Sequence, residues 1–60
     1  MNEITVTIQA PHLHPDSVDL VKKVMLSKFK LKADYEIISQ QECYWRLTGT
    51  YSALLEAGYL

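Results

Sequence analysis

Residues 33–38, Ala-Asp-Tyr-Glu-Ile-Ile, decide between the two folds that the rest of the chain allows. A strand followed by a helix, as predicted for the residues before them, can continue either as a second helix or as a second strand. Together with residue 31, this stretch alternates between apolar and polar side chains, which is the pattern of a strand with one buried face. The sequence therefore predicts a strand over residues 31–38 whose inner face carries Leu31, Ala33, Tyr35 and Ile37.

The residues before this stretch predict a strand and then a helix. Residues 3–10 alternate and are rich in β-branched side chains, which favours a strand. Pro15 suits the first position of a helix, with His14 or Asp16 as its cap. Apolar residues then recur at a spacing of three and four up to about residue 30, so one face of the helix packs against the sheet. That face carries Val18, Val21, Met25 and Phe29.

The residues after it predict a turn, a third strand and a short helix. Residues 39–42 are polar and connect the second strand to a strand over residues 43–50. Thr50 or Ser52 can cap a helix over residues 52–57, and Gly58 suits the left-handed residue that often follows a helix. In the third strand Cys43, Trp45 and Leu47 are expected to face inward, and Tyr44, Arg46, Thr48 and Thr50 outward.

This order of elements predicts a single α+β domain over residues 1–60, a two-layer sandwich with both helices on one face of a three-stranded sheet. The β-α-β-β-α order resembles a truncated ferredoxin-like fold without its fourth strand. We expect the sheet order first, third, second strand, with the first and third strands parallel. The first strand would then keep a free edge, unless residues 1–2 or 59–60 cover it. A resemblance in element order alone implies no function.

The alternative fold is a ribbon-helix-helix dimer. The Ile-Thr-Val-Thr-Ile run of residues 4–8 followed by a helix is typical of its DNA-binding ribbon. Thr5, Thr7 and Gln9 would then face the major groove. This fold requires a second helix that begins near residue 32, where the alternation of residues 33–38 predicts a strand instead.

Composition limits the classes of function. The chain has 60 residues, 48% of them hydrophobic, and a formal net charge of −1. Cys43 is the only cysteine, so no disulfide can form within the chain. The sequence shows neither the basic start of a signal peptide nor an apolar run of the roughly 18 residues that would suggest a membrane span. We expect a cytoplasmic protein that does not associate with membranes.

Motifs for metal binding or catalysis are weak. His12, His14 and Asp16 alternate and could converge on a zinc ion with Cys43, but a helix cap and a solvated loop explain the two histidines more simply. Cys43 lies on the inward face of a predicted strand, where cysteine behaves as a small apolar residue. No glycine-rich phosphate loop is present. We expect no enzyme activity, no metal and no cofactor.

Basic residues gather on the predicted first helix. Five of them lie between residues 22 and 32, which indicates a solvated helix face that complements the helix dipole. The alternative is a phosphate-binding patch. Asp34 and Glu36 follow directly and dilute the positive charge. A nucleic-acid-binding regulator is thus the second functional hypothesis, with contacts from Lys22, Lys23, Lys28, Lys30, Tyr44 and Arg46.

The leading hypothesis is a small protein-interaction module. It would bind a larger protein, as an accessory subunit, an inhibitor or a phage-type modulator, or bind itself as a homodimer. One candidate surface is the edge of the first strand with Thr5, Thr7 and Gln9, which could accept another strand. The other is the flank of the first helix with Leu20 and Val24, unless the second helix covers it.

Overall fold

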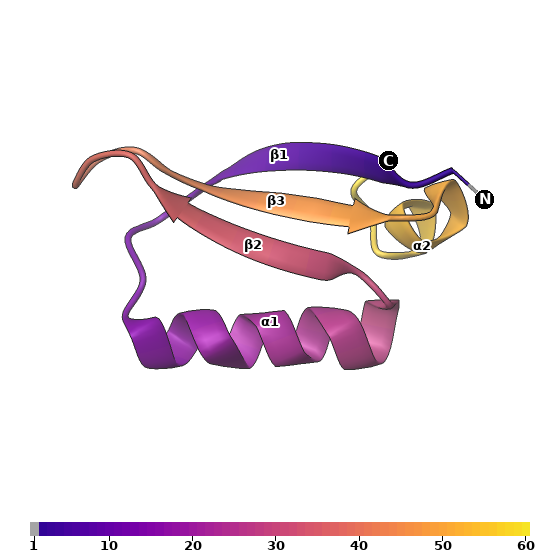
Figure 1. Cartoon of the computed structure of the whole chain (residues 1–60), viewed down its shortest axis with the longest axis horizontal. Helices are drawn as coiled ribbons and strands as arrows, with labels where there is room; N and C mark the ends of the chain where they lie inside the picture. The colour runs from indigo at the N-terminus through magenta and orange to yellow at the C-terminus, as the bar shows by residue number, and fades with distance from the viewer. Residues whose placement is uncertain (1) are drawn as a thin grey trace.

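The computed structural model describes residues 2–60 and shows the predicted order of elements (Figure 1). The chain forms a small α+β domain, in which a twisted three-stranded sheet lies against helices. None of the described helices is long and apolar enough to cross a membrane. The elements are β1 (Ile4–Ala10), α1 (Pro15–Phe29), β2 (Lys32–Ile37), β3 (Cys43–Gly49) and α2 (Tyr51–Glu56).

The sheet has the predicted strand order β1-β3-β2, but the predicted parallel pairing of the first and third strands is wrong. β1 runs antiparallel to β3, with Val6 opposite Leu47, and β2 runs antiparallel to β3, with Ala33 opposite Leu47. β1 and β2 are therefore parallel to each other, with β3 between them. α1 connects these two parallel strands, and the hairpin after β2 reverses the chain, so that β3 opposes both.

The ribbon-helix-helix alternative is also wrong, because residues 32–37 form β2 where that fold requires a second helix. The predicted alternation matches the burial of residues 31–35 but fails at the end of the strand, where Glu36 is half-buried and Ile37, predicted on the inner face, is exposed. Ala33 is buried and Tyr35 half-buried, whereas Lys32 and Asp34 are exposed. Period-two burial is what a strand with one covered face requires, and a helix would have mixed these side chains around its surface.

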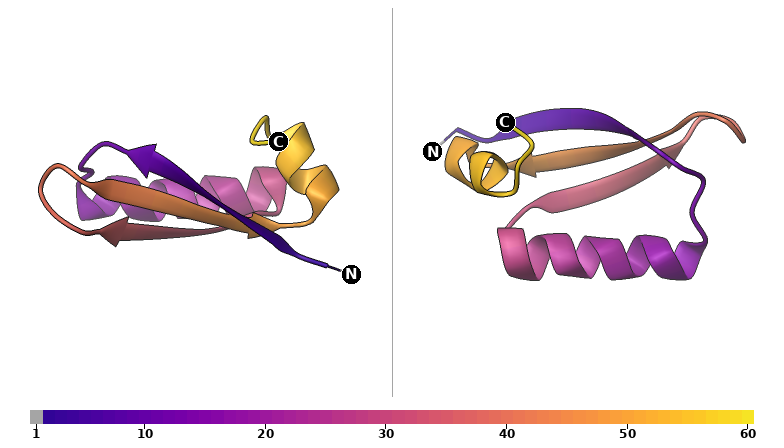
Figure 2. Two further views of the ribbon diagram at one scale, coloured as in Figure 1. Left: turned by 90° about the horizontal axis from the view of Figure 1, so that it is seen from above. Right: turned by 180° about the vertical axis from the view of Figure 1, so that it is seen from behind.

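The core lies between the inner face of the sheet and the two helices. Its buried apolar side chains come from the start of β2, from β3 and from α2. Half-buried residues of α1, including Val21 and Met25, pack against this cluster. Figure 2 shows that α1 runs along the sheet, whereas the shorter α2 lies at the end where β3 finishes. The core residues are Leu31, Ala33, Trp45, Leu47 and Leu54.

Both helices begin at a predicted cap. The Nδ1 atom of His14 accepts a hydrogen bond from the backbone N–H of Asp16, at 3.2 Å. Thr50 caps α2, because its Oγ1 accepts from the backbone N–H of Ala53 at 3.1 Å. These bonds occupy N–H groups that have no partner within their own helices.

A left-handed residue lies just beyond each helix, directly after α1 and one residue later, after Ala57, beyond α2. Lys30 follows α1 with φ 57°, and Gly58 follows α2 with φ 88°, as predicted for this glycine. After α2, the N–H of Gly58 bonds the carbonyl of Leu55, and the N–H of Tyr59 bonds that of Leu54. This pair of bonds reverses the chain and directs Tyr59 onto the core.

Tyr35 connects β2 to the segment between β1 and α1. Its hydroxyl donates to the carbonyl of Pro11 at 2.8 Å and accepts from the backbone N–H of Leu13 at 2.9 Å. Its ring packs against Trp45, with ring centroids 4.9 Å apart and planes inclined by 51°. One side chain thus fixes the path of the first connection relative to the sheet.

Candidate protein-binding edge

The β1 edge is the side of Ile4–Ala10 that faces away from β3. β1 is an outer strand, paired only with β3. No backbone hydrogen bond outside that ladder involves residues 4–10, among the residues that the structure describes. Every second residue of an outer strand directs its N–H and C=O groups away from the sheet, so this strand offers a row of unused donors and acceptors.

The side chains of β1 form two faces without charge. Thr5, Thr7 and Gln9 are exposed on the outer face, opposite Thr48, Arg46 and Tyr44 of β3. The Oγ1 atoms of Thr5 and Thr48 lie 3.0 Å apart, within hydrogen-bond distance. On the inner face the apolar side chains are only half-buried, although the equivalent residues of β3 are buried. These half-buried residues are Ile4, Val6, Ile8 and Ala10.

β2, the other outer strand, differs from β1 because it carries charged side chains. Its outer face presents three of them in succession, Lys32, Asp34 and Glu36. Glu36 forms an ion pair with Arg46 of β3. α1 packs along β2 and covers its inner face. Charged side chains along an outer strand are a common means by which proteins prevent unwanted strand pairing, because a neighbouring strand would have to bury them.

The C-terminal residues do not pair with β1. The backbone N–H of Tyr59 is used by the carbonyl of Leu54, and the Tyr59 side chain packs against the core. Of the N-terminal pair, Met1 lies outside the described residues, and Asn2 is exposed and outside any strand. The β1 edge therefore has no strand partner within residues 2–60.

The Leu20/Val24 flank of α1 is exposed. Leu20 has 63% of its surface exposed and Val24 has 37%. The expectation that the second helix covers both residues is wrong, because α2 has only six residues, lies at the end of the sheet and leaves both exposed. The flank is thus a second apolar surface, although it offers no backbone groups to a partner.

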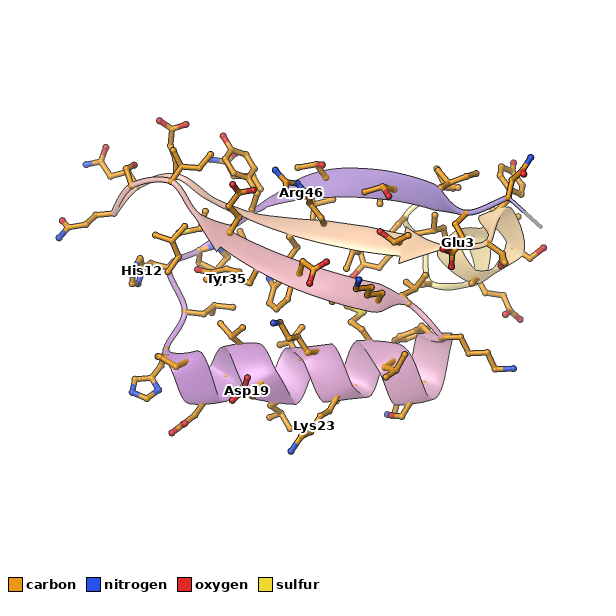
Figure 3. All side chains as sticks on the ribbon, in the orientation of Figure 1. Glu3, His12, Asp19, Lys23, Tyr35 and Arg46 are labelled. Carbon is orange, nitrogen blue, oxygen red and sulfur yellow. The ribbon has the colours of Figure 1, made fainter. Side chains whose placement is uncertain are left out.

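The residues of the nucleic-acid hypothesis lie on two different layers. Figure 3 shows Arg46 on the sheet and Lys23 on α1, directed away from the sheet. Lys22, Lys23 and Lys28 belong to α1 and Lys30 ends it, whereas Tyr44 and Arg46 belong to the outer face of β3. The Arg46 guanidinium pairs with Glu36, and the Tyr44 hydroxyl donates to Glu42 at 3.2 Å. Neighbouring carboxylates repel phosphate, so this face does not form a basic site.

The side chains of the weak metal-binding pattern do not come together in the structure. The Nδ1 atom of His14 is used in capping α1 and lies 3.7 Å from a carboxylate oxygen of Asp16. His12 is exposed in the preceding connection. Cys43 is buried on the inner face, where its Sγ lies 3.8 Å from the carbonyl of Ser39. No three His, Cys, Asp or Glu side chains of the described chain form a group that could hold a metal ion.

Two features of this site were not predicted. The first is the contrast in charge between the two outer strands, which the sequence could have shown, because the predicted strand order already places β2 at the second edge. The second is the incomplete burial of the inner face of β1. Comparisons of the chain with protein-family models, with curated proteins and with solved structures found no match.

Proposed function

We propose that this protein is a protein-interaction module that binds a strand of its partner at the β1 edge. The observation that carries the proposal is the contrast between the two outer strands. β2 carries Lys32, Asp34 and Glu36 and is packed by α1, whereas Ile4–Ala10 carries no charge and pairs only with β3 among the described residues. An edge with no protection of its own is the surface at which strand addition occurs.

Two contributions to the free energy would stabilise an added strand. Each new backbone hydrogen bond contributes a net free energy of about 0.5–1.5 kcal/mol. A neighbouring strand also covers the half-buried inner side chains, of which Val6 and Ile8 are the central pair. Burial of their remaining apolar surface contributes about 25 cal/mol per Å². The backbone supplies affinity, and the side chains facing Val6 and Ile8 select the partner.

A module of this kind acts by occupying the surface of a larger protein, as an accessory subunit, an inhibitor or another regulator. Thr5, Thr7 and Gln9 lie beside the added strand on the outer face, and the Leu20/Val24 flank of α1 can extend the contact. We also propose that the protein acts in a reducing compartment such as the cytoplasm, because Cys43 is a buried free thiol.

The test compares capture by three forms of the chain in an extract of the native cell. The edge variant Thr5→Lys/Thr7→Lys adds two positive charges beside the β1 edge. The control variant Gln40→Lys/Gln41→Lys adds the same charge at the exposed turn between β2 and β3, where neither side chain makes a hydrogen bond among the described residues. We expect a partner that the wild type and the control retain and the edge variant loses.

Amide hydrogen exchange on the purified pair then locates the contact. Binding should slow the exchange of alternate amides in residues 4–10, which are the amides directed away from β3. A captured partner that the edge variant retains equally well, or that leaves exchange in β1 unchanged, would contradict the proposal. Circular dichroism of each variant confirms that the fold is intact.

A further inference from the structure

The sequence of β1 is a palindrome over residues 4–8, Ile-Thr-Val-Thr-Ile, with Val6 at its centre. The structure places the whole palindrome in one strand, with Ile4, Val6 and Ile8 on the inner face and the two threonines on the outer face. A surface that meets a copy of itself across a two-fold axis must be complementary to itself. A palindromic edge strand satisfies this condition in antiparallel pairing.

We propose that the strand accepted by the β1 edge is β1 of a second copy, antiparallel, with the two-fold axis at Val6. This inference rests on the proposed function of β1 as an edge that accepts strands. It gives a symmetric dimer with one continuous sheet in the order β2-β3-β1-β1-β3-β2.

The register follows from the alternation of the faces. Residues directly opposite in an antiparallel pair lie on the same face of the sheet. With the axis at Val6, each Val6 faces Val6 of the second copy, and each Ile4 faces Ile8. On the outer face Thr5 of one copy faces Thr7 of the other. Pairs of β-branched residues and pairs of threonines are favourable neighbours across strands.

Electrostatics permit this contact. Residues 4–10 carry no charge, and Glu3 lies opposite Gln9 of the second copy, so no like charges meet. The net charge of −1 for each copy produces little repulsion.

Pairing through β1 also limits the assembly to two copies. Pairing of the two β1 edges uses both unprotected edges of the sheet. The outer strands of the resulting sheet are then the two β2 strands, with their charged Lys32, Asp34 and Glu36. The assembly therefore stops at two copies. It also makes self-pairing and partner binding mutually exclusive, because both use the same backbone groups of β1.

The first test measures the mass of the wild-type chain by sedimentation equilibrium from about 10 μM to about 1 mM. We expect a reversible monomer–dimer equilibrium within this range. Thr5→Lys/Thr7→Lys places two pairs of lysines opposite each other and should raise the dissociation constant about tenfold or more. Gln40→Lys/Gln41→Lys should leave it unchanged. A chain that stays monomeric over the whole range overturns the inference.

The second test locates the axis. In a Cys43→Ala background, Val6→Cys places two thiols opposite each other at the axis, so mild oxidation should produce a covalent dimer. Lys32→Cys, on the opposite edge of the sheet, should not. A dimer that forms without cross-linking through residue 6 overturns the proposed axis.

The outcomes separate this inference from the proposed function. A strictly monomeric chain that still captures a partner in an edge-dependent manner contradicts only the self-pairing. A dimer linked through Val6 in a chain that captures no other protein supports the inference and limits the partner to the chain itself. A dimer that the edge variant does not weaken contradicts the inference, and the capture experiment still judges the proposed function independently.

Discussion

The hydroxyl of Tyr35 donates a hydrogen bond to the carbonyl of Pro11 across 24 positions of sequence, at 2.8 Å. The same oxygen accepts from the N–H of Leu13. The connection between β1 and α1 is thus held by a residue of β2, the strand farthest from β1 in the sheet. This contact links β2 to the connection that follows β1.

Tyr35→Phe should destabilise the fold by about 1 kcal/mol, because it removes one partner from both hydrogen bonds and retains the ring packing with Trp45. Urea denaturation followed by the fluorescence of Trp45, the only tryptophan, measures this loss. Tyr44→Phe is the matched control, since its hydroxyl bonds only the exposed Glu42. Equal losses of stability from the two variants would show that the hydrogen bonds of Tyr35 to Pro11 and Leu13 add no specific stability.

Alkaline pH should weaken the fold through two tyrosines. Desolvation of the Tyr35 hydroxyl is the main cause that raises its pKa above the usual 10.0. A hydrogen bond with Glu42 is the main cause that raises the pKa of Tyr44. The folded chain therefore keeps these protons at pH values where the unfolded chain has released them.

The stability from these groups is complete below pH 10, and it is lost as the pH rises through the higher pKa values of the folded state. Circular dichroism during urea denaturation at several pH values measures the decline. Tyr35→Phe and Tyr44→Phe should each make it less steep. A decline of equal slope in both variants and in the wild type would assign it to other groups.

Gly49→Ala should cost about 1–3 kcal/mol, because its new methyl group would overpack the core. A Cβ atom at this position would lie 2.5 Å from Cδ2 of Leu31, whose side chain is completely buried. Leu31→Val removes part of the obstruction at the cost of a cavity. The double variant should thus be more stable than the sum of the single effects predicts, as measured in a double-mutant cycle. Additive losses would contradict the steric explanation.

Thr50→Ala should destabilise the fold by about 1 kcal/mol through loss of the cap of α2. Ser52→Ala serves as the control, because Ser52 is exposed in the first turn and its hydroxyl makes no hydrogen bond among the described residues. Thermal unfolding monitored by circular dichroism compares the two. Similar midpoints for both variants would show that α2 does not depend on its cap.

Local patterns predicted most of this fold. Alternation located all three strands and, apart from the exposed Ile37, their inner faces, and the chemistry of His14, Thr50 and Gly58 located three helix ends. The predicted parallel pairing of β1 and β3 was wrong. The true direction follows from the connections, because α1 returns the chain parallel to β1 and the hairpin after β2 then reverses it. The two hydrogen bonds of the Tyr35 hydroxyl to the segment between β1 and α1 could not be predicted, because they depend on the path of that segment. The alternation of β2 indicates an inward Tyr35 side chain, but the path of Pro11 and Leu13 decides what the hydroxyl reaches.

The candidate edge was predictable in part. The strand order and the absence of charge in residues 4–10 both follow from the sequence. The exposure of Leu20 did not follow, because it depends on where the short α2 comes to lie. The position of α2 involves the burial of Leu54, which is a property of the assembled core.

The pairing of β1 with β3 has a consequence for the order of folding. Thr5 and Thr48 meet across 43 positions of sequence, whereas β2 and β3 are joined by a single turn. Closing the longer loop costs more chain entropy, so the β2–β3 hairpin can form before β1 docks on it. We expect β1 to be the last strand to arrive and the first to leave. Native-state hydrogen exchange should therefore show faster exchange in Ile4–Ala10 than in the hairpin, so the strand with the free edge is also the strand that opens most readily.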